Sequence, residues 1–332
     1  MRDPHPHAHY RARGAGLILL ALLALAVTFG GALWPHDPDR PLDPAVAGLS
    51  PPGARWSVVR LADGHELAAR GLRREGDRIE LDRATAPAAI TLERLDGPPE
   101  SAITERTFVL GSDKFGRDIV ARLLSGGRVS LAVALLVVAC ILAIGVPLGT
   151  LAAMSPPRVD RLLLRSFETL QAFPRLFLLL ALAAIVRPGF VAVALILGLT
   201  GWVPMARLVR AEMRVLRSKE YVLAAQVSGA TPLSIVFRHL LPNAAAPILI
   251  EASLAAAAAI ASEAALSFLG YGLQPPTASW GNMVADGREV LAGGWWVALF
   301  PGLAIALAAL SFNLIGEGFR DALDRRAAAK RV

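Results

Sequence analysis

Four charged residues interrupt long apolar stretches of the sequence, and they are the first positions at which chemistry could take place. Glu168 and Arg175 stand seven residues apart in one stretch, and Glu251 and Glu263 stand twelve apart in another. On a helix the first pair would share a face about 10 Å apart, and the second would be separated by about 18 Å along the axis. A charge inside a membrane costs about 2.5 kcal/mol or more, so we expect these side chains to face a helical bundle or a pathway through it, or to lie near the cytoplasmic interface. For Glu168 and Arg175 we favour a structural role.

The sequence lacks the signatures of common catalytic sites. No Gly-Lys pair occurs, which excludes a phosphate-binding loop of the G-x-x-x-x-G-K-[ST] type. His-Glu-x-x-His, Gly-x-Ser-x-Gly and a plausible pair of catalytic carboxylates are also missing. The only cysteine, Cys140, falls in an apolar stretch, which excludes an intrachain disulfide and argues against a cysteine-based metal site. We therefore expect that this chain is not an enzyme and binds no metal or cofactor itself.

The composition places the chain among polytopic membrane proteins. Hydrophobic residues make up 55% of the 332 residues, and the mean hydropathy is +0.51. The apolar residues cluster in blocks long enough to cross a bilayer. They predict an all-α polytopic membrane protein with six transmembrane helices, at residues 15–33, 129–153, 166–186, 189–206, 244–270 and 292–316. A cleaved signal peptide is the alternative for the first block, although no clear small-residue cleavage site follows it.

The distribution of basic residues predicts the orientation of these helices. The tail before the first block, the two loops after the second and fourth blocks, and the tail after the sixth hold three, three, six and five basic residues. The two short loops on the other side hold one each, Arg187 and Arg288. Because basic residues are retained on the cytoplasmic side, both termini are predicted to be cytoplasmic. The net charge of +7 is therefore attributed to topology and not to nucleic-acid binding.

A polar insert separates the first two predicted helices. Residues 35–107 are rich in Pro, Gly, Arg and acidic residues, with charges of both signs nearly balanced. Turn signals at Asp63-Gly64 and Glu75-Gly76-Asp77 separate short runs that predict a small β meander, at residues 56–61, 65–69, 78–82 and 90–95. Residues 54–95 are flanked by proline pairs, and we expect a separable module outside the membrane.

The basic loop after the fourth helix predicts a helical hairpin at the inner membrane face. The segment Glu220 to Ser228 favours a short helix, and Gly229 suits a left-handed C-terminal cap. Thr231 and Pro232 suit the N-cap and first position of a second helix, which Pro242 is expected to close. Its apolar residues share one helical face: Leu233, Val236, Phe237, Leu240 and Leu241. Each helix is too short to span a membrane, which needs about 20 residues.

This segment resembles the "EAA" cytoplasmic loop of permease subunits of binding-protein-dependent ABC importers. The matching residues are Ala224, Ala225 and Gly229, followed by Leu241 and Pro242. Leu223 stands where the family pattern has Glu. The resemblance implies that these six positions form a coupling helix and its turn, within a cytoplasmic loop at residues 207–243, and that they contact a groove of a separate ATPase subunit.

Two further segments resemble the dipeptide, oligopeptide and nickel branch of these permeases, in its C-type subunit. The first contains the residues that the resemblance assigns to a periplasmic gate: Gly111, Asp113, Gly116, Arg117 and Asp118. The apolar stripe that follows them, with Ile119 and Leu123, predicts a helix along the outer membrane surface. The second segment contains Trp280 to Met283. The predicted organisation is a cytoplasmic tail and first helix (1–34), the periplasmic insert (35–107), the importer transmembrane domain (108–326) and a cytoplasmic tail (327–332).

The resemblance implies a type I ABC importer fold and a multi-pass protein of the bacterial inner membrane. It implies a permease subunit for di- or oligopeptides, with ATP and Mg on two partner ATPase subunits. The other implied partners are a second, homologous permease and a periplasmic or lipid-anchored substrate-binding protein. A permease for nickel or another metal chelate is the alternative within transport. A membrane scaffold or sensor without transport is the alternative of a different class.

Overall fold

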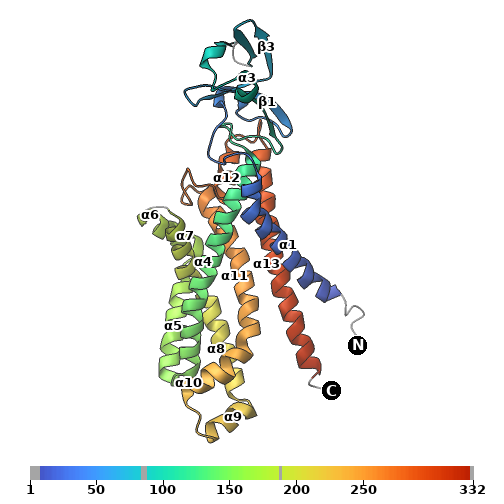
Figure 1. Cartoon of the computed structure of the whole chain (residues 1–332). Coiled ribbons are helices and arrows are strands. Elements are labelled where there is room, and N and C mark those ends of the chain that lie inside the picture. The colour runs from blue at the N-terminus through green and yellow to red at the C-terminus, as the bar shows by residue number, and fades with distance from the viewer. Residues whose placement is uncertain (1–7, 84–87, 187–188, 330–332) are drawn as a thin grey trace. The chain divides into compact units, whose positions relative to one another are not determined.

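The computed structural model describes residues 8–83, 88–186 and 189–329 (Figure 1). Of the predicted positions, Arg187 and residues 330–332 of the tail lie outside this description. The chain divides into two compact units. Unit 1 comprises residues 1–24, 130–273 and 305–332, and unit 2 comprises residues 25–129 and 274–304. Each unit is considered by itself below.

Four helical segments are long and apolar enough to cross a membrane. They lie in α1 (Ala8–Leu33), α4 (Ile119–Met154), the run from α10 (Pro232–Ile235) into α11 (Leu241–Phe268), and α13 (Trp296–Ala329). Two pairs of helices, each bent at a short break, are also long and apolar enough when the pair is taken together. They are α5 (Pro157–Ala172) with α6 (Arg175–Ile185), and α7 (Phe190–Gly201) with α8 (Val203–Arg217). If each pair is one span, the total is six. This agrees with the predicted fold class of six transmembrane helices.

Each of the third and fourth predicted spans is divided into two helices, which the sequence analysis did not predict. The bend between α5 and α6 is 80°, and the bend between α7 and α8 is 42°. Pro174 separates the first pair, and the residue before it, Phe173, is extended with φ −81° and ψ 130°. A proline lacks the N–H of a helical bond and disfavours helical dihedrals in the preceding residue. The prediction that Glu168 and Arg175 share one face of a single helix is therefore wrong.

Glycines bring the helices of unit 1 close together. A Cβ atom on Gly145 of α4 would lie 2.8 Å from the Cβ of Met205 on α8, and one on Gly149 would collide with the carbonyl oxygen of Ala206. Small residues permit such close packing of membrane helices, where the hydrophobic effect does not drive helices together. α11 packs against the same helix, α8. These contacts fix α8, the helix that leads into the basic loop.

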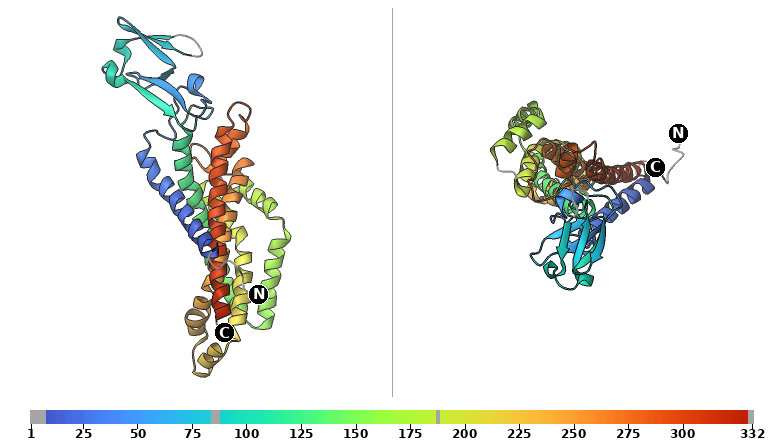
Figure 2. Two further views of the ribbon diagram at one scale, coloured as in Figure 1. Left: turned by 90° about the vertical axis from the view of Figure 1, so that its right-hand side faces the viewer. Right: turned by 90° about the horizontal axis from the view of Figure 1, so that it is seen from above.

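Unit 2 contains the insert, which folds into two small antiparallel sheets (Figure 2). One has the order β2-β1-β6, from β1 (Ala54–Arg60), β2 (Glu66–Ala69) and β6 (Ile103–Phe108). The other has the order β3-β4-β5, from β3 (Gly71–Glu75), β4 (Arg78–Asp82) and β5 (Ala88–Thr91). Short helical turns complete the insert, α2 (Pro44–Ala47), η1 (Leu92–Arg94) and α3 (Pro99–Ala102). The expectation of a β-rich insert is confirmed.

The boundaries predicted for this module are wrong. The strand β6 lies beyond residue 95 and pairs along the whole of β1, with Ala54 opposite Phe108. Residues before the module also belong to its core, because Leu42, Val46 and Phe108 are all buried in one apolar cluster. The sequence TERT in β6 has no strong alternation of apolar residues, so its pattern gave no strand signal. The folded module therefore extends to Phe108.

The predicted surface helix after Asp118 is also wrong. Residues from Ile119 onward are the first turns of α4, which continues without a break to Met154. The backbone N–H of Val120 donates to Oδ1 of Asp118 at 2.7 Å, so this carboxylate caps the start of the long helix. Gly126 and Gly127 do not interrupt it, because α12 (Trp280–Arg288) and the residue before it pack against them.

Candidate functional site

The basic loop of unit 1 contains two helical segments joined by a glycine turn. α9 (Glu220–Val227) ends at Ser228, and Gly229 has φ +81°, the left-handed conformation predicted for it. The backbone N–H of Ala230 donates to the Ala225 carbonyl at 3.0 Å, which closes the end of α9. Thr231 is the N-cap of α10, and its Oγ1 accepts from the Ser234 N–H at 3.3 Å. The local geometry of this turn therefore follows from the residue types.

The second arm of this hairpin does not end at Pro242, contrary to the prediction. α10 passes into a π-helical segment (η2, Val236–Leu240) and then directly into α11, where Pro242 lies in the first turn. A proline ring inside a regular α-helix clashes with the carbonyl four residues before it. A π-helical turn inserts an extra residue at this point and allows the chain to continue. The loop is thus joined to the span that follows without a flexible connection.

The two segments expose apolar side chains at the end of unit 1 away from α6 (Figure 1). Val222 is fully buried and anchors α9, whereas Leu223 is 47% exposed and Val227 is 91% exposed. Leu233 and Phe237 are 69% and 62% exposed. The remaining residues predicted for this site are accessible to different degrees, with Ala224, Gly229 and Pro242 exposed and Ala225 and Leu241 half-buried. We call Leu223, Val227, Leu233 and Phe237 the apolar face of the hairpin.

An apolar hollow of about 420 Å³ lies beside this face, between α4 and α10. It is lined mainly by aliphatic side chains, with Leu151 and Met154 on one side and Leu233 and Phe237 on the other. Large exposed apolar surfaces of this kind mark interaction sites or lipid contact.

A buried carboxylate fixes α8, from which the hairpin extends. Asp160 of α5 accepts from Arg210 through Nε at 2.5 Å and Nη2 at 2.7 Å, and from Arg214 at 2.6 Å. Its side chain is only 5% exposed. A two-pronged contact with guanidinium holds both groups in one geometry. Asp160 was missed by the sequence analysis, although it is the one acidic residue among the arginines of its loop.

In unit 2 the predicted gate residues meet in one loop. The Asp113 carboxylate accepts from the backbone N–H of Arg117 at 2.9 Å and from its Nε at 2.6 Å. Gly111 and Gly116 have φ of +87° and +75°, which only glycine adopts easily. A Cβ atom on Gly111 would lie 2.7 Å from the indole Nε1 of Trp296. The loop is therefore rigid and closely packed.

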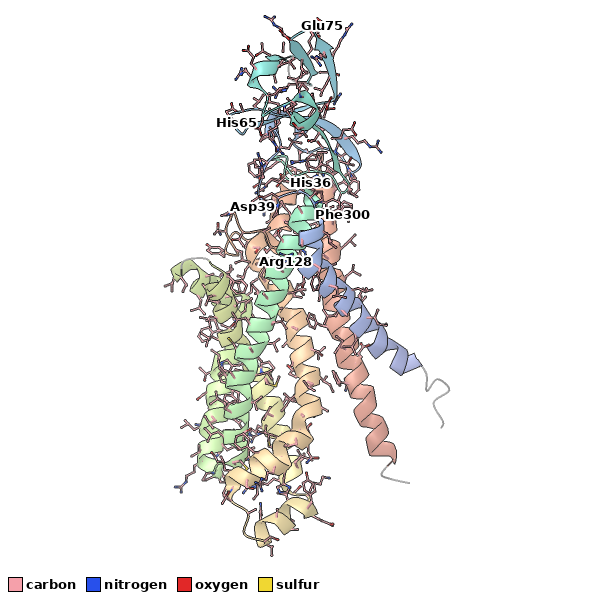
Figure 3. The ribbon with its side chains drawn as sticks, viewed as in Figure 1. His36, Asp39, His65, Glu75, Arg128 and Phe300 are labelled. Atoms are coloured by element: carbon pink, nitrogen blue, oxygen red, sulfur yellow. The ribbon has the colours of Figure 1, made fainter. Side chains whose placement is uncertain are left out.

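Asp118, the last residue of this loop, connects it to the segment that precedes the insert. Its Oδ2 accepts from the indole N–H of Trp34 at 3.2 Å and pairs with Nδ1 of His36. The neighbouring Arg122 lies 3.5 Å from Asp39 and 3.7 Å from Asp113. Figure 3 marks His36 and Asp39 in this region. The sequence analysis missed these partners because they lie more than 80 residues away in the chain.

The helix α12 and the residue that follows it, Glu289, contribute acidic groups to the same loop. Asp286 lies 3.9 Å from Arg117, and burial raises the pKa of Asp286. Lys114 donates to Glu289 at 2.5 Å, and this hydrogen bond lowers the pKa of Glu289. The loop is thus tied by ion pairs both to the N-terminal segment and to α12.

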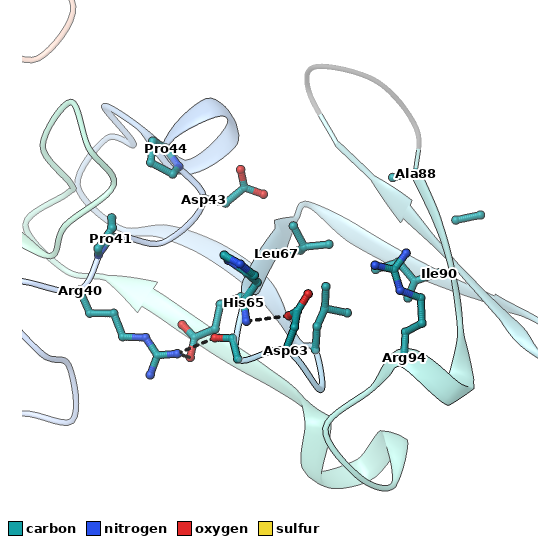
Figure 4. Close-up of a pocket in the computed structure, with 14 residues that line it drawn as sticks. Arg40, Pro41, Asp43, Pro44, Asp63, His65, Leu67, Ala88, Ile90 and Arg94 are labelled. Atoms are coloured by element: carbon teal, nitrogen blue, oxygen red, sulfur yellow. Dashed lines mark hydrogen bonds and ion pairs between the residues drawn. The ribbon is translucent and has the colours of Figure 1, made fainter.

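Unit 2 contains a concave region of about 690 Å³ in the insert (Figure 4). Arg40 and Glu66 of its lining contact each other. Arg40 donates to the Gly64 carbonyl at 3.1 Å and lies 3.3 Å from Glu66. The Glu66 carboxylate also lies within 3.7 Å of Arg60 and 3.3 Å of Arg106. We interpret this network as the packing of the insert and assign no ligand to it.

The four charged residues of the apolar stretches lie in separate environments. Glu168 is exposed on α5, and Arg175 begins α6 beside Gly201. Glu251 is half-buried on α11, and Glu263 of the same helix is buried and accepts from the Ser267 hydroxyl at 2.8 Å. Within the described ranges, Glu168 and Arg175 form no ion pair, and three or more metal-binding side chains gather nowhere. The sequence analysis had placed Glu168 and Arg175 on one helical face and favoured a structural role for them.

A family model described as "Binding-protein-dependent transport system inner membrane component" matches residues 145–329, which is more than half of the chain. The chain belongs to this family. The match contains α5 to α11, and with them Asp160, the glycine turn and the apolar face of the hairpin. The protein is therefore a multi-pass permease component of the inner membrane, as the spans and the loop motif had indicated.

Named relatives agree with this family. The di/tripeptide transport system permease protein DppC of Pseudomonas aeruginosa is 41% identical over 217 residues, covering 65% of this chain and 72% of the relative. The dipeptide transport system permease protein DppC of Alkalihalophilus pseudofirmus is 40% identical over 231 residues, covering 70% and 74%. Among solved structures, the inward-facing MetNI methionine ABC transporter matches with a TM-score of 0.49 and 18% identity over 60% of this chain and 96% of that chain.

Proposed function

We propose that this family member is the permease subunit of an importer for di- and oligopeptides, in which separate subunits hydrolyse ATP. The apolar face of the hairpin is the observation that carries the proposal. Val227 and Phe237 are 91% and 62% exposed, although the positive-inside bias assigns this loop to the cytoplasm. Exposed apolar side chains do not stabilise a loop that remains in water, whereas a docking surface buries them against a partner protein. Peptide as the substrate class is supported by the names of the relatives, which are peptide permeases.

The hairpin would couple ATP hydrolysis to transport through its rigid connections. The Asp160–Arg210 contacts fix α8 on one side of the hairpin, and η2 joins the other side to α11. A displacement of α9 by a bound ATPase would therefore move two spans together. Leu223, Ala224, Ala225, Gly229, Leu241 and Pro242 are the proposed coupling residues.

The remaining parts of the proposal concern partners and orientation. Two ATPase subunits would bind ATP and Mg, and a second homologous permease would complete the pathway. A periplasmic or lipid-anchored binding protein would deliver the substrate to the side that holds the insert and the loop of Gly111 to Asp118, which we propose as a gate element. Both termini would be cytoplasmic. With its boundary moved to Phe108, the insert of residues 35–108 would be periplasmic, residues 109–326 would form the transmembrane domain and 327–332 the cytoplasmic tail.

Site-specific photo-crosslinking tests the docking proposal. A photoreactive amino acid is placed at Val227 in the full complex, and a matched variant has it at Asp77, an exposed position of the insert. We expect the Val227 variant to crosslink to an ATPase subunit and the Asp77 variant not to do so. Crosslinking of Val227 to lipid alone, with ATPase subunits present, would contradict the proposal.

A further inference from the structure

Arg175 lies where the two broken spans of unit 1 meet. It is the first residue of α6, directly after the 80° bend that follows α5. Its guanidinium lies against Gly201, the last residue of α7, at the 42° bend into α8. A Cβ atom on Gly201 would lie 3.0 Å from Nη2 of Arg175, so the missing side chain makes room for this group. Two interruptions of helical structure and one cation therefore occupy the same place.

Among the described residues, none supplies a counter-charge to this guanidinium. Throughout the parts of the chain that the structure describes, Arg175 forms no ion pair and no hydrogen bond, even to a carbonyl at the end of α7. Arg210 and Arg214 of the neighbouring α8, by contrast, both bind Asp160. A guanidinium offers five donors and cannot lose its charge in a protein. Arg175 therefore retains its full capacity to bind an anion.

The position of Arg175 along the helices places it in the apolar part of the fold. Gly201 lies eleven residues from the start of the uncharged helix α7, which is about 17 Å. The first basic residue of α8, Arg207, is six residues further, about 9 Å. The hydrocarbon core of a bilayer is about 30 Å thick, so this count of residues puts Arg175, which is exposed on the surface of the single chain, within the apolar stretch that would cross it. An unpaired cation at this depth is stable only where it faces a bundle interior or a water-filled pathway.

We propose that Arg175 binds the C-terminal carboxylate of a peptide as it passes through the pathway. A planar guanidinium matches a carboxylate in a two-pronged contact. Arg175 is also the first residue of α6, so the positive end of that helix dipole lies at the same place. The α-carboxylate is common to all linear peptides, so one arginine recognises the class without selecting side chains. This inference rests on the proposed function and adds a substrate contact to it.

The test uses the complete complex with its partner subunits in lipid nanodiscs, without the soluble binding protein. Binding of labelled tri-alanine and of its C-terminal amide is compared by equilibrium dialysis. The variants are Arg175→Met, which keeps the apolar stem, Arg175→Lys, which keeps the charge, and Gly201→Ala, which places a methyl group against the guanidinium. Arg165→Met, at an exposed position of α5, is the matched control.

We expect the unsubstituted complex to bind the acid roughly tenfold or more tightly than the amide, the scale of a hydrogen bond to a charged group. Arg175→Met should abolish this preference, Arg175→Lys should retain part of it, and Gly201→Ala should weaken it. Arg165→Met should leave it unchanged. Assembly and basal ATP hydrolysis are measured on every variant to show that the complex is intact.

Four results would overturn the inference while peptide import by the unsubstituted complex remained. The preference could survive Arg175→Met, or be absent from the unsubstituted complex. Arg175→Met could release the second permease, which would assign the guanidinium to an acidic residue of that partner. If the effect of Arg175→Met depended only on whether anionic lipid is present, the guanidinium would be assigned to a lipid phosphate. Failure of the unsubstituted complex to import any peptide would instead remove the proposed function itself.

Discussion

Gly229 is the residue at which the conformation of the coupling hairpin is decided. Its φ of +81° is unfavourable for residues with a Cβ, and nothing lies within 4 Å of the position that a Cβ would take. A substitution there acts through backbone strain alone, of about 1–2 kcal/mol for most residues. We expect Gly229→Val to release the ATPase subunits or to uncouple hydrolysis from uptake, and Gly229→Asn, which tolerates this conformation better, to retain both. Co-purification and transport are measured side by side.

Leu223→Glu provides the comparison at the position where the sequence departs from the family pattern. The side chain is 47% exposed, so a carboxylate there remains partly solvated. We expect a cost of less than about 1.5 kcal/mol in docking. If Leu223→Glu damages docking as much as Gly229→Val does, the groove of the ATPase requires an apolar residue and the shape of the turn is not the main determinant.

Asp160→Asn should destabilise the complex. The carboxylate holds Arg210 and Arg214, and its removal leaves Arg210, with a side chain that is 17% exposed, without a counter-charge. Loss of a hydrogen-bonded charge pair at a partly exposed site costs about 1–3 kcal/mol. The measurement is the temperature at which half of the detergent-solubilised complex remains monodisperse. Glu168→Gln, an exposed carboxylate on the same helix, is the control and should not change it.

Local rules predicted individual residues only where the partners are close in sequence. Gly229 and Thr231 have the geometry that their types imply, because their hydrogen bonds join residues a few positions apart. The partners of Asp160 and Asp118 lie 50 or more residues away, and no pattern in the sequence connects them.

At the scale of elements, proline had different effects at different sites. Pro174 broke the third span with an 80° bend, whereas Pro147 lies within the unbroken helix α4 and Pro242 follows a π-helical segment. The apolar pattern correctly predicted which stretches are helical, since it depends on burial in lipid. The outcome at each proline depends on whether neighbouring structure can accommodate the lost hydrogen bond. This explains why the number of spans was predicted and their bends were not.

The corrected boundary of the insert gives a prediction at the same scale. Ala54 and Phe108 are opposite each other in the β1–β6 pair, so their Cα atoms are about 5 Å apart and a short Gly/Ser linker can replace residues 54–108. With Leu42 and Val46 changed to Ser, we expect membrane insertion and ATPase association to be retained. Replacement of residues 54–95 alone removes β1 and leaves β6 without its partner, and should cause aggregation. The two replacements are compared by size-exclusion chromatography and by co-purification with the ATPase subunits.

Loss of the assembled complex on the longer replacement would contradict a separable insert. It would indicate that the sheets contact another subunit. Loss of uptake with assembly intact would instead be consistent with a contact between the insert and the binding protein.

At the scale of the whole molecule, the bias of basic residues predicts opposite sides of the membrane for the insert and the hairpin. Single cysteines at Asp77 and Val227, both exposed, are introduced into a chain in which Cys140 is replaced by Ala. An impermeant thiol reagent added to intact cells should label the first position and spare the second, and the reverse should hold in inside-out vesicles. Labelling of both from the same side would refute the six-span topology.

The central claim, ATP-driven import of peptides through a complex that contains this chain, is tested most directly by transport in proteoliposomes. The reconstituted complex receives ATP inside, on the ATPase side, and the binding protein with radiolabelled tri-alanine outside. We predict accumulation of the peptide with ATP, none with a non-hydrolysable analogue, and loss of accumulation in the Gly229→Val complex. Absence of peptide uptake while a nickel chelate is transported, or uptake that is indifferent to ATP hydrolysis, would contradict the account.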